Sequence, residues 1–332
     1  MNDISIVFIC DDNYVMPTGV AINSLRINRC KQTFYKIYVL TNNVAEENEA
    51  KILMLNDENF SIEIKHLNKN ETYVKNYMKN KKRAAHVSYT ALYKFDICNI
   101  FESMDKILYL DSDIIIKSDL IELFNTDLGE KYAGVVKDYA PMKYNPPITE
   151  KLKINHTAYF SSGVMLLNLK KMRDDNLYEK LVEYSINGLN FFRDQDTFNV
   201  VFKENVIYLS FKYNANLSNL IKYDSEIISK YYDLVFYENK INYFKDAYII
   251  HMTTLEKPWK KFAPYLTKLF KYYLNNSPFK QKFKVRFSKV LFMAFIGKRI
   301  KIMPVRLMLE LIFRVRFIGI GETLLFRRRS GK

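Results

Sequence analysis

Two aspartates at the end of a short apolar run have the spacing of a divalent-metal site. Residues 107–110 are apolar, as in a strand buried on both faces of a mostly parallel sheet, and Asp111 and Asp113 follow directly. Alternate side chains of an extended backbone point to the same side, so the two carboxylates can share one cation. Ligand sites of open α/β sheets lie beyond the carboxyl ends of the strands. The pair therefore predicts a metal site able to hold a phosphorylated ligand.

Two other interpretations of this Asp-x-Asp pair stay open on these residues alone. The pair could be a solvated turn after a strand, or the nucleophile pair of a phosphatase-type site. The phosphatase site usually has Thr or Val two residues after the second Asp and lies early in the chain. Here that residue is Ile115, a third of the way along. The other motifs in the chain favour the metal site.

A second polar group follows the first predicted strand, residues 4–9. Asp11, Asn13 and Tyr14 stand there, before a helical pattern over residues 16–25. Acidic acceptors beside an aromatic ring suit a nucleotide base, which can be hydrogen-bonded at its edge and stacked on its face. A polar loop with an aromatic lid on the core explains the same residues equally well.

Three further candidates carry little weight when each is taken alone. His251 follows the apolar stretch 248–250, where a packed or surface histidine is more common than a ligand. Lys257 lies in Lys-Pro-Trp with Trp259, the only tryptophan, which could simply anchor packing. Lys94 falls near the acidic strand, at a position that is usually solvated.

The elements that would position these residues alternate between strands and helices, which predicts parallel βαβ units and an α/β fold. We expect strands at residues 4–9, 34–40, 61–66, 107–110, 132–136, 164–167, 206–209 and 248–250. We expect helices at 16–25, 45–55 and 86–100, with others beginning near 118, 168 and 192. The polar stretch 68–83, rich in Lys and Asn, is predicted to be a surface connection.

Composition limits the class of protein. The 332 residues are 48% hydrophobic, enough for one large domain with an appendage. Only 9 glycines are present, without a GxxxxGK[ST] or GxGxxG pattern, which argues against a glycine-rich phosphate loop. Cys10, Cys30 and Cys98 are odd in number and widely spaced, so we expect reduced thiols and a cytosolic location. No secretion signal is evident at the N-terminus.

The net charge of +15 belongs almost entirely to the C-terminal tail. Residues 280–332 contain 15 Lys and Arg against two acidic residues, a balance of +13, whereas the first 279 residues are nearly neutral. The longest uncharged run of the tail, 290–297, is too short to span a bilayer. On both sides of this run, over residues 286–306, basic and apolar residues interleave, which favours an interfacial helix on an anionic membrane surface. A solvated cationic tail is the alternative. Nucleic-acid binding is disfavoured because the basic tail is also rich in apolar residues and the first 279 residues are nearly neutral.

Taken together, these motifs resemble those of the retaining family-eight glycosyltransferases, specifically the bacterial lipopolysaccharide core glucosyl- and galactosyltransferases. The resemblance covers roughly residues 4–280 and depends on seven motifs in the family's order. They are Asp-Asp-Asn-Tyr at 11–14, His86, Leu-Tyr-Leu-Asp-Ser-Asp at 108–113, Val-Val-Lys-Asp at 135–138, Phe-Ser-Ser-Gly-Val at 160–164 before Asn168, Asp-Gln-Asp at 194–196, and His251 followed by Lys-Pro-Trp.

The resemblance implies a GT-A type nucleotide-sugar-binding fold, a mixed sheet flanked by helices, over residues 1–279, with a basic helical membrane-associating extension at 280–332. It implies transfer of glucose or galactose from a UDP-sugar, with retention, to a lipid-linked lipopolysaccharide or lipooligosaccharide core acceptor. The enzyme would be cytoplasmic and peripheral on the inner face of the bacterial inner membrane. A catalytically degenerate relative that binds a nucleotide sugar or the membrane, and a transferase for another surface glycan, are the alternatives.

Residue roles follow from the same resemblance. Mn²⁺, or Mg²⁺, would be held by Asp111, Asp113 and His251, and Lys257 would meet the diphosphate. Asp11 and Asn13 would contact the uracil, with Tyr14 stacked on it and Ser112 near the ribose. The hexose would be held by Lys94, Asp194 and Gln195, and His86, Asp138 and Ser161 complete the predicted nucleotide-sugar site.

Retention could proceed by double displacement, with Gln195 or Asp194 as the nucleophile, or by front-face attack within an ion pair. We favour the front-face route because an amide is a poor nucleophile. Three positions depart from the family pattern: Lys94 where Arg is usual, Ser161 where Asn is common, and Thr254 where a Gly normally lies three residues after the metal histidine. The departure at Thr254 puts a side chain where it could crowd the diphosphate.

Overall fold

The structure is a computed structural model, and it describes residues 3–67, 89–144, 146–253, 257, 259–262, 264–281, 286–287, 315–320 and 323–328. Its centre is a seven-stranded sheet in the order β3-β2-β1-β4-β7-β6-β8. The strands are β1 (Ile4–Cys10), β2 (Tyr35–Thr41), β3 (Phe60–His66), β4 (Lys106–Leu110), β6 (Ala133–Lys137), β7 (Phe160–Asn168) and β8 (Val206–Tyr208). Strands β3, β2, β1 and β4 are parallel, whereas β7 runs antiparallel to both β4 and β6. The sheet is therefore mixed, as predicted.

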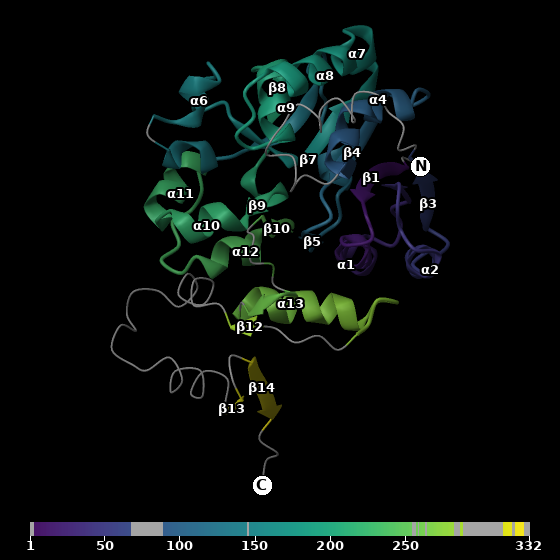
Figure 1. Cartoon of the computed structure of the whole chain (residues 1–332), viewed down its shortest axis with the longest axis vertical. Coiled ribbons are helices and arrows are strands. Elements are labelled where there is room, and N and C mark those ends of the chain that lie inside the picture. The colour runs from purple at the N-terminus through teal and green to yellow at the C-terminus, as the bar shows by residue number, and fades with distance from the viewer. Residues whose placement is uncertain are drawn as a thin grey trace.

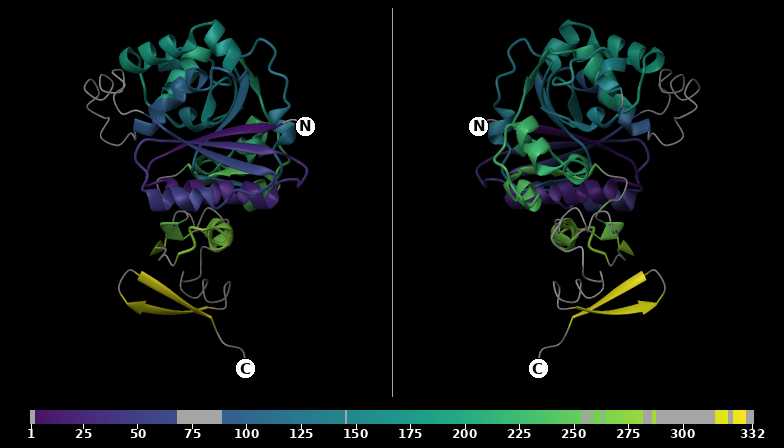
Figure 2. Two further views of the ribbon diagram at one scale, coloured as in Figure 1. Left: turned by 90° about the vertical axis from the view of Figure 1, so that its right-hand side faces the viewer. Right: turned by 90° about the vertical axis from the view of Figure 1, so that its left-hand side faces the viewer.

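Helices cover both faces of this sheet (Figures 1 and 2). Alternation along β1 shows how the sequence directs this, because Ile6 and Phe8 enter one core while Val7 and Ile9 enter the other. The helices are α1 (Val15–Asn28), α2 (Glu46–Leu53), η2 (Tyr89–Asp96), α4 (Ile97–Ile100), α5 (Ile121–Phe124), η3 (Ala140–Lys143), α6 (Ile148–Lys151), α7 (Leu169–Asp174), α8 (Leu177–Asn187), α9 (Asp194–Phe202), η4 (Phe211–Tyr213), α10 (Leu217–Lys222), α11 (Ser225–Tyr232), α12 (Ile241–Asp246) and α13 (Pro264–Asn275).

A second, three-stranded sheet was not predicted, and it carries part of the site. It has the order β5-β10-β9, formed by β5 (Ile114–Ile116), β10 (Ile249–His251) and β9 (Ala215–Asn216). Strand β5 begins directly after Asp113 and pairs with β10, so that His251 stands opposite Ile114. Residues more than a hundred positions apart are thus brought to one place by a short antiparallel ladder.

The described part of the predicted helix at 86–100 is helical, but most of it is not an α-helix. Residues Tyr89–Asp96 form a 3₁₀ segment, and only Ile97–Ile100 are α-helical. Tyr93, Lys94 and Phe95 are all buried, and three consecutive buried side chains do not fit the single buried face of an amphipathic helix. Strand β7 also begins four residues before the predicted start at 164, and so includes Ser161 and Ser162.

Helix α13 packs on the main body through α1. The Asn23 side-chain amide donates to the carbonyl oxygens of Tyr273 (2.9 Å) and Asn276 (3.0 Å). Asn28 donates to the Tyr273 hydroxyl at 2.7 Å. Two helices distant in sequence are thereby joined by amide hydrogen bonds.

Parts of the basic extension are strands, where a helix is predicted. Strand β12 (Arg286–Phe287) pairs in parallel with β11 (Lys261–Phe262), and β13 (Val315–Ile320) forms a hairpin with β14 (Thr323–Arg328), beyond α13 in Figure 1. Both segments are rich in residue types that favour strands, such as Val315, Phe317, Ile318 and Phe326, which explains the difference. Residues 288–314, which include most of the predicted interfacial helix, lie outside the described residues. Among the described helices, none is long and apolar enough to cross a bilayer.

Candidate functional site

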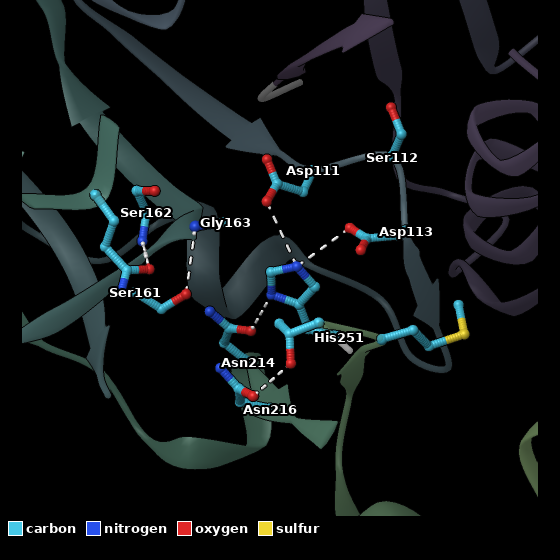
Figure 3. A network of polar contacts seen from close by, with 12 residues as sticks. Asp111, Ser112, Asp113, Ser161, Ser162, Gly163, Asn214, Asn216 and His251 are labelled. Carbon is cyan, nitrogen blue, oxygen red and sulfur yellow. Dashed lines mark hydrogen bonds and ion pairs between the residues drawn. The ribbon is translucent and has the colours of Figure 1, made fainter. Parts of the chain in front are cut away.

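Asp111, Asp113 and His251 converge at the carboxyl end of β4, as the sequence and the resemblance predicted (Figure 3). The Nε2 atom of His251 lies 3.4 Å from Oδ2 of Asp111 and 3.2 Å from Oδ1 of Asp113. One ligand atom from each residue lies within 4.8 Å of the other two. Two carboxylates and an imidazole that face one point could hold a divalent metal ion.

The intervening residue, Ser112, points away from this cluster. Its hydroxyl accepts a hydrogen bond from Thr18 (2.8 Å) and donates to the carbonyl oxygen of Ile9 (3.2 Å). The expected alternation therefore holds even though Asp111 lies just beyond the last residue of β4. Anchoring of Ser112 between β1 and α1 turns both neighbouring aspartates toward His251.

Asn214 orients the imidazole of His251. Its Oδ1 lies 3.0 Å from Nδ1 of His251, and Asn214 is almost fully buried. An amide oxygen can only accept, so Nδ1 carries a proton and Nε2 faces the point between the two aspartates, where a bound cation would take the place of the Nε2 proton. This is the outer-shell arrangement that fixes the tautomer of metal-binding histidines.

Two buried lysines complete the charge balance. Lys94 Nζ lies 2.9 Å from Oδ1 of Asp111 and 2.9 Å from Oδ2 of Asp194. Lys257 Nζ donates to Oδ2 of Asp113 and, at 2.6 Å, to the carbonyl oxygen of Met252. Each aspartate of the pair therefore has one oxygen toward His251 and the other toward an ammonium group.

The pKa shifts show how strongly this place attracts positive charge. Burial disfavours the imidazolium, yet the carboxylates of Asp113 and Asp111 raise the pKa of His251 to about 9. Burial also opposes ionisation of Asp113, but Lys257 and His251 lower its pKa to about 2. For Lys94, burial is outweighed by Asp111 and Asp194, which raise its pKa well above the usual value. In each case a neighbouring opposite charge overcomes desolvation.

A second polar network adjoins the first. Gln195 Nε2 donates to Oδ2 of Asp138 (2.9 Å), and Gln195 Oε1 accepts from the Ser162 amide (3.1 Å). The Ser162 hydroxyl donates to Oδ2 of Asp194 at 3.0 Å. Ser161, by contrast, only accepts a long bond (3.4 Å) from the Gly163 amide. Asp194 and Gln195 begin α9, so this helix start is bound to β6 and β7.

The two networks line one cavity of about 570 Å³. Of the predicted residues, its walls include Lys94, Asp111, Asp113, Asp138, Ser161, Asp194, Gln195 and His251. This volume suits a small ligand such as a sugar nucleotide. Most of the predicted sugar and metal residues are thus gathered in one hollow.

The predicted base-binding residues lie beside this cavity and do not line it. Asp11 Oδ1 accepts from the backbone amides of Asn13 (3.0 Å) and Tyr14 (3.1 Å), which shapes the turn after β1. Tyr14 is 38% exposed. Burial raises the pKa of Tyr14, and the charges of Lys257 and Asp113 also act on it, so its phenol lies on the metal side of the cavity. His86 and Thr254 lie outside the described residues.

Sequence reasoning missed Asn214, Ser162 and Asn216. Asn216 and Ser162 line the cavity, and Asn214 contacts His251. Asn214 directly precedes β9, a strand of only two residues of which Asn216 is the second, so no periodicity marks them. The signal that was available is two asparagines at alternate positions, which share one side of an extended segment.

Comparisons with known proteins agree with this geometry. The family model described as "Glycosyl transferase family 8" matches residues 5–263. A lipopolysaccharide 1,2-glucosyltransferase of Escherichia coli (strain K12) is 29% identical over 281 residues, covering 83% of this chain and 79% of that protein. A putative glycosyltransferase of Haemophilus influenzae is 24% identical over 212 residues, covering 63% and 62% of the two chains.

Two solved structures have the same fold. The apo structure of the bifunctional glycosyltransferase WbbM aligns with a TM-score of 0.69 and 24% identity, over 84% of this chain and 50% of that one. The galactosyltransferase LgtC, solved with donor and acceptor sugar analogs, aligns with a TM-score of 0.67 and 22% identity, over 83% and 96% of the two chains. The chain therefore belongs to glycosyl transferase family 8, and it is a sugar-transferring enzyme with the GT-A fold.

Proposed function

We propose that this enzyme transfers glucose or galactose from a UDP-sugar to a lipopolysaccharide or lipooligosaccharide core acceptor, with retention and with the help of Mn²⁺ or Mg²⁺. The observation that carries the proposal is the convergence of Asp111, Asp113 and His251 in the cavity of a family-eight chain. The E. coli relative named as a lipopolysaccharide 1,2-glucosyltransferase supports the acceptor class.

The donor atoms suit such an ion. Carboxylate oxygens are the preferred ligands of Mg²⁺ and Mn²⁺, and an imidazole nitrogen in the set favours Mn²⁺. The hydrogen bond to Asn214 holds the His251 ring in a fixed orientation, as such a bond does for most metal-binding histidines. When bound, the ion would offset the charge of the departing UDP. We assign Asp111, Asp113 and His251 to holding it.

Lys257 is proposed to share this task. Its ammonium group already contacts Asp113 and is buried at the metal side of the site. A fixed positive charge at this position would meet the diphosphate and stabilise it more as negative charge develops on the leaving oxygen. We assign the turn after β1, with Asp11, Asn13 and Tyr14, to the uracil, and His86 to the nucleotide, as the resemblance implies. The resemblance also implies Ser112 for the ribose side, and since its hydroxyl is bonded to Thr18 and Ile9, we assign only its backbone to that role.

At the sugar end we assign Lys94, Asp194, Gln195, Asp138 and Ser161 to the hexose. Both candidate nucleophiles are already held by neighbours. The Asp194 carboxylate contacts Lys94 and Ser162, and both ends of the Gln195 amide are hydrogen-bonded. These contacts support the front-face route, in which the two side chains orient the sugar and form no covalent bond to it.

The test is hydrolysis and transfer with UDP-glucose and UDP-galactose, in Mn²⁺ and in EDTA. We compare the wild type with Asp113→Asn and with a matched control, Asp127→Asn, whose carboxylate accepts from the Gly129 amide in a turn and does not line the cavity. We expect turnover of one donor, lost in EDTA and reduced at least about a hundredfold by Asp113→Asn but not by Asp127→Asn.

Binding of UDP without turnover of either donor, with lipopolysaccharide acceptor present, would replace this proposal by a non-catalytic nucleotide-sugar binder. Turnover that persists in EDTA would contradict the metal-dependent part.

We propose further that the 280–332 extension holds the enzyme at the cytoplasmic face of the inner membrane. Its balance of +13 supports attraction to anionic lipid, at about 1 kcal/mol per basic residue near the surface. Flotation of the full chain with anionic vesicles, and its absence with neutral vesicles or at high salt, is the expected result. Equal binding to both vesicle types would contradict it.

A further inference from the structure

Two lysines at the cavity have no role in the proposed donor site, one in its wall and one on the exposed surface beside it. Lys222, the last residue of α10, lines the cavity, and Lys143 is the last residue of η3. Neither residue was singled out by its sequence pattern. Their position in the proposed site raises the question of which ligand they meet.

The fold holds these two segment ends together. Tyr223, directly after Lys222, packs edge-on against Tyr139 with ring centroids 4.6 Å apart. The Tyr223 hydroxyl donates to the carbonyl oxygen of Ala140 at 3.5 Å. Because Tyr139 and Ala140 begin η3, these contacts place the ends of α10 and η3 side by side.

The two ammonium groups lie close enough to repel each other. Burial and the neighbouring Lys143 charge both lower the pKa of Lys222. Among the described residues, no carboxylate forms an ion pair with either lysine. A pair of like charges without an acidic partner is unfavourable unless water or a bound anion compensates it.

The nearest carboxylate, Asp138, is directed elsewhere. Its Oδ1 accepts from the Ala140 amide (3.0 Å) and from Asn219 Nδ2 (2.8 Å), and its Oδ2 accepts from Gln195 (2.9 Å). Three donors therefore occupy this acid. It attracts Lys222 only at longer range. Lys143 Nζ lies over the Tyr144 ring, 4.7 Å from its centroid, and among the described residues no oxygen accepts a hydrogen bond from either ammonium group.

The negative charge of the proposed donor belongs to the other side of the cavity. Contacts run from Asp111 through Lys94 to Asp194, and from Gln195, the next residue, to Asp138. Lys222 lines the cavity together with Asp138, whose charge acts on it, so we place the lysine pair at the Asp138 end of this series and the metal ligands at its Asp111 end. An anion at the lysine pair would therefore belong to the second substrate.

We propose that Lys143 and Lys222 form a subsite for an anionic group, a phosphate or a carboxylate, on the acceptor saccharide. The inference rests on the proposed transferase function and deepens it, because it names a chemical feature of the acceptor. Lysine ammonium groups are compact point charges that bind phosphate well, and two of them can grip one phosphate from both sides. The subsite would select acceptors that carry the charge near the hydroxyl that is glycosylated.

The first test needs no turnover. Brief labelling with acetic anhydride, read by mass spectrometry, reports the accessibility of Lys143 and Lys222, with Lys170 on the exposed face of α7 as internal control. Samples contain Mn²⁺ and UDP, and then glucose, glucuronate or glucose 6-phosphate. We expect glucose 6-phosphate to protect both lysines at least threefold and glucose not to protect them, with Lys170 unchanged. Glucuronate separates a carboxylate from a phosphate subsite.

Two outcomes of this labelling would overturn the subsite. Protection by UDP and Mn²⁺ alone would assign the lysines to the donor. Equal labelling with glucose, glucuronate and glucose 6-phosphate would make them a solvated pair. Either result can be read even if the enzyme transfers no sugar, so failure of the subsite stays distinct from failure of the transferase proposal.

The second test measures transfer to deacylated lipopolysaccharide core oligosaccharide, before and after dephosphorylation with aqueous hydrogen fluoride. The double variant Lys143→Gln/Lys222→Gln is compared with Lys51→Gln/Lys170→Gln, which removes two charges at residues that do not line the cavity. We expect the first variant to raise KM for the phosphorylated acceptor about tenfold to a hundredfold, and to abolish the preference over the dephosphorylated one. An equal loss on both acceptors, or none on either, would refute the subsite.

Discussion

The backbone of Gly163 leaves no space for a side chain beside His251. A Cβ atom built there would lie 2.1 Å from Cε1 of the imidazole and 2.8 Å from Oδ2 of Asp111. The Gly163 carbonyl oxygen also accepts from the Asp111 amide at 2.8 Å, so the glycine touches two of the three proposed ligands. Glycine is required at position 163 because the backbone there lies too close to His251 and Asp111 for any side chain.

Gly163→Ala should therefore displace the imidazole and separate the proposed metal ligands. A shift of about 1 Å in such a site can cost about a hundredfold in rate, so we expect UDP-sugar turnover to fall by about that factor. The matched control is Gly134→Ala on β6, where the new Cβ would meet only the flexible Leu209 and Leu128 side chains, the closest at 3.3 Å. Turnover and circular-dichroism melting of both variants check this, and equal activity of the two would contradict it.

The hydrogen bond from His251 to Asn214 leads to a second prediction. In Asn214→Ala the imidazole loses its acceptor, and loss of such an outer-shell partner typically weakens metal binding by about tenfold to a hundredfold. Asn214→Asp keeps an acceptor at the same position and should retain most of the affinity. Titration of Mn²⁺ by calorimetry measures both, and an unchanged affinity in Asn214→Ala would show that Asn214 serves packing alone.

The sequence was informative where chemistry and strand pattern coincide. Asp111 and Asp113 end an apolar strand, so both their sheet position and their common direction were predictable, and Ser112 turns away as alternation requires. His251 was harder, because an apolar strand followed by one histidine has many meanings. The order of the motifs predicted that His251 would join the two aspartates. The pairing of β5 with β10, which brings it there, was not predicted.

What the sequence could not predict depends on long-range packing. Lys94 was expected on a helix, but burial of Tyr93, Lys94 and Phe95 together selects a 3₁₀ segment, and the ion pairs of Lys94 make its burial possible. Asn214 has no local signal because β9 is only two residues long. Such contacts join segments that neither periodicity nor capping rules relate to each other.

Thiol chemistry gives a third prediction. Cys10 and Cys98 are buried, and burial raises the pKa of Cys10 to about 12 and that of Cys98 to about 11. Cys30 is exposed. Because the thiolate is the reactive form, a disulfide reagent at pH 8 should react rapidly with Cys30 alone in the folded protein, and with all three thiols in guanidinium chloride.

The variant Cys30→Ser serves as the control for this experiment. It should abolish the rapid reaction and leave two thiols that appear only on unfolding. If a second thiol of the folded wild type reacted rapidly, the hydrophobic core around Cys10 or the one around Cys98 would open more readily than its packing indicates.

The fourth prediction concerns Lys94, whose ammonium group joins Asp111 to Asp194 at 2.9 Å on each side. Lys94 is only 5% exposed, so Lys94→Met would leave two carboxylates facing each other with little water to separate them. Removal of one partner from a buried ion pair typically costs about 3–5 kcal/mol. We expect the free energy of unfolding in EDTA to fall by about that amount, and turnover to fall with it.

Two further variants separate charge from packing at this position. Lys94→Arg keeps the charge, and its fork can reach both carboxylates, so it should recover most of the lost stability. Lys106→Met makes the same substitution at the start of β4, where the lysine lies over the Phe124 ring and is half-buried, and should cost less than about 1 kcal/mol. If Lys94→Met were as stable as Lys106→Met in urea denaturation, the contact of Asp111 with His251 and that of Asp194 with Ser162 would have to be enough to stabilise the two carboxylates. In that case Lys94 would serve only to orient Asp194, and its loss would appear in turnover and not in stability.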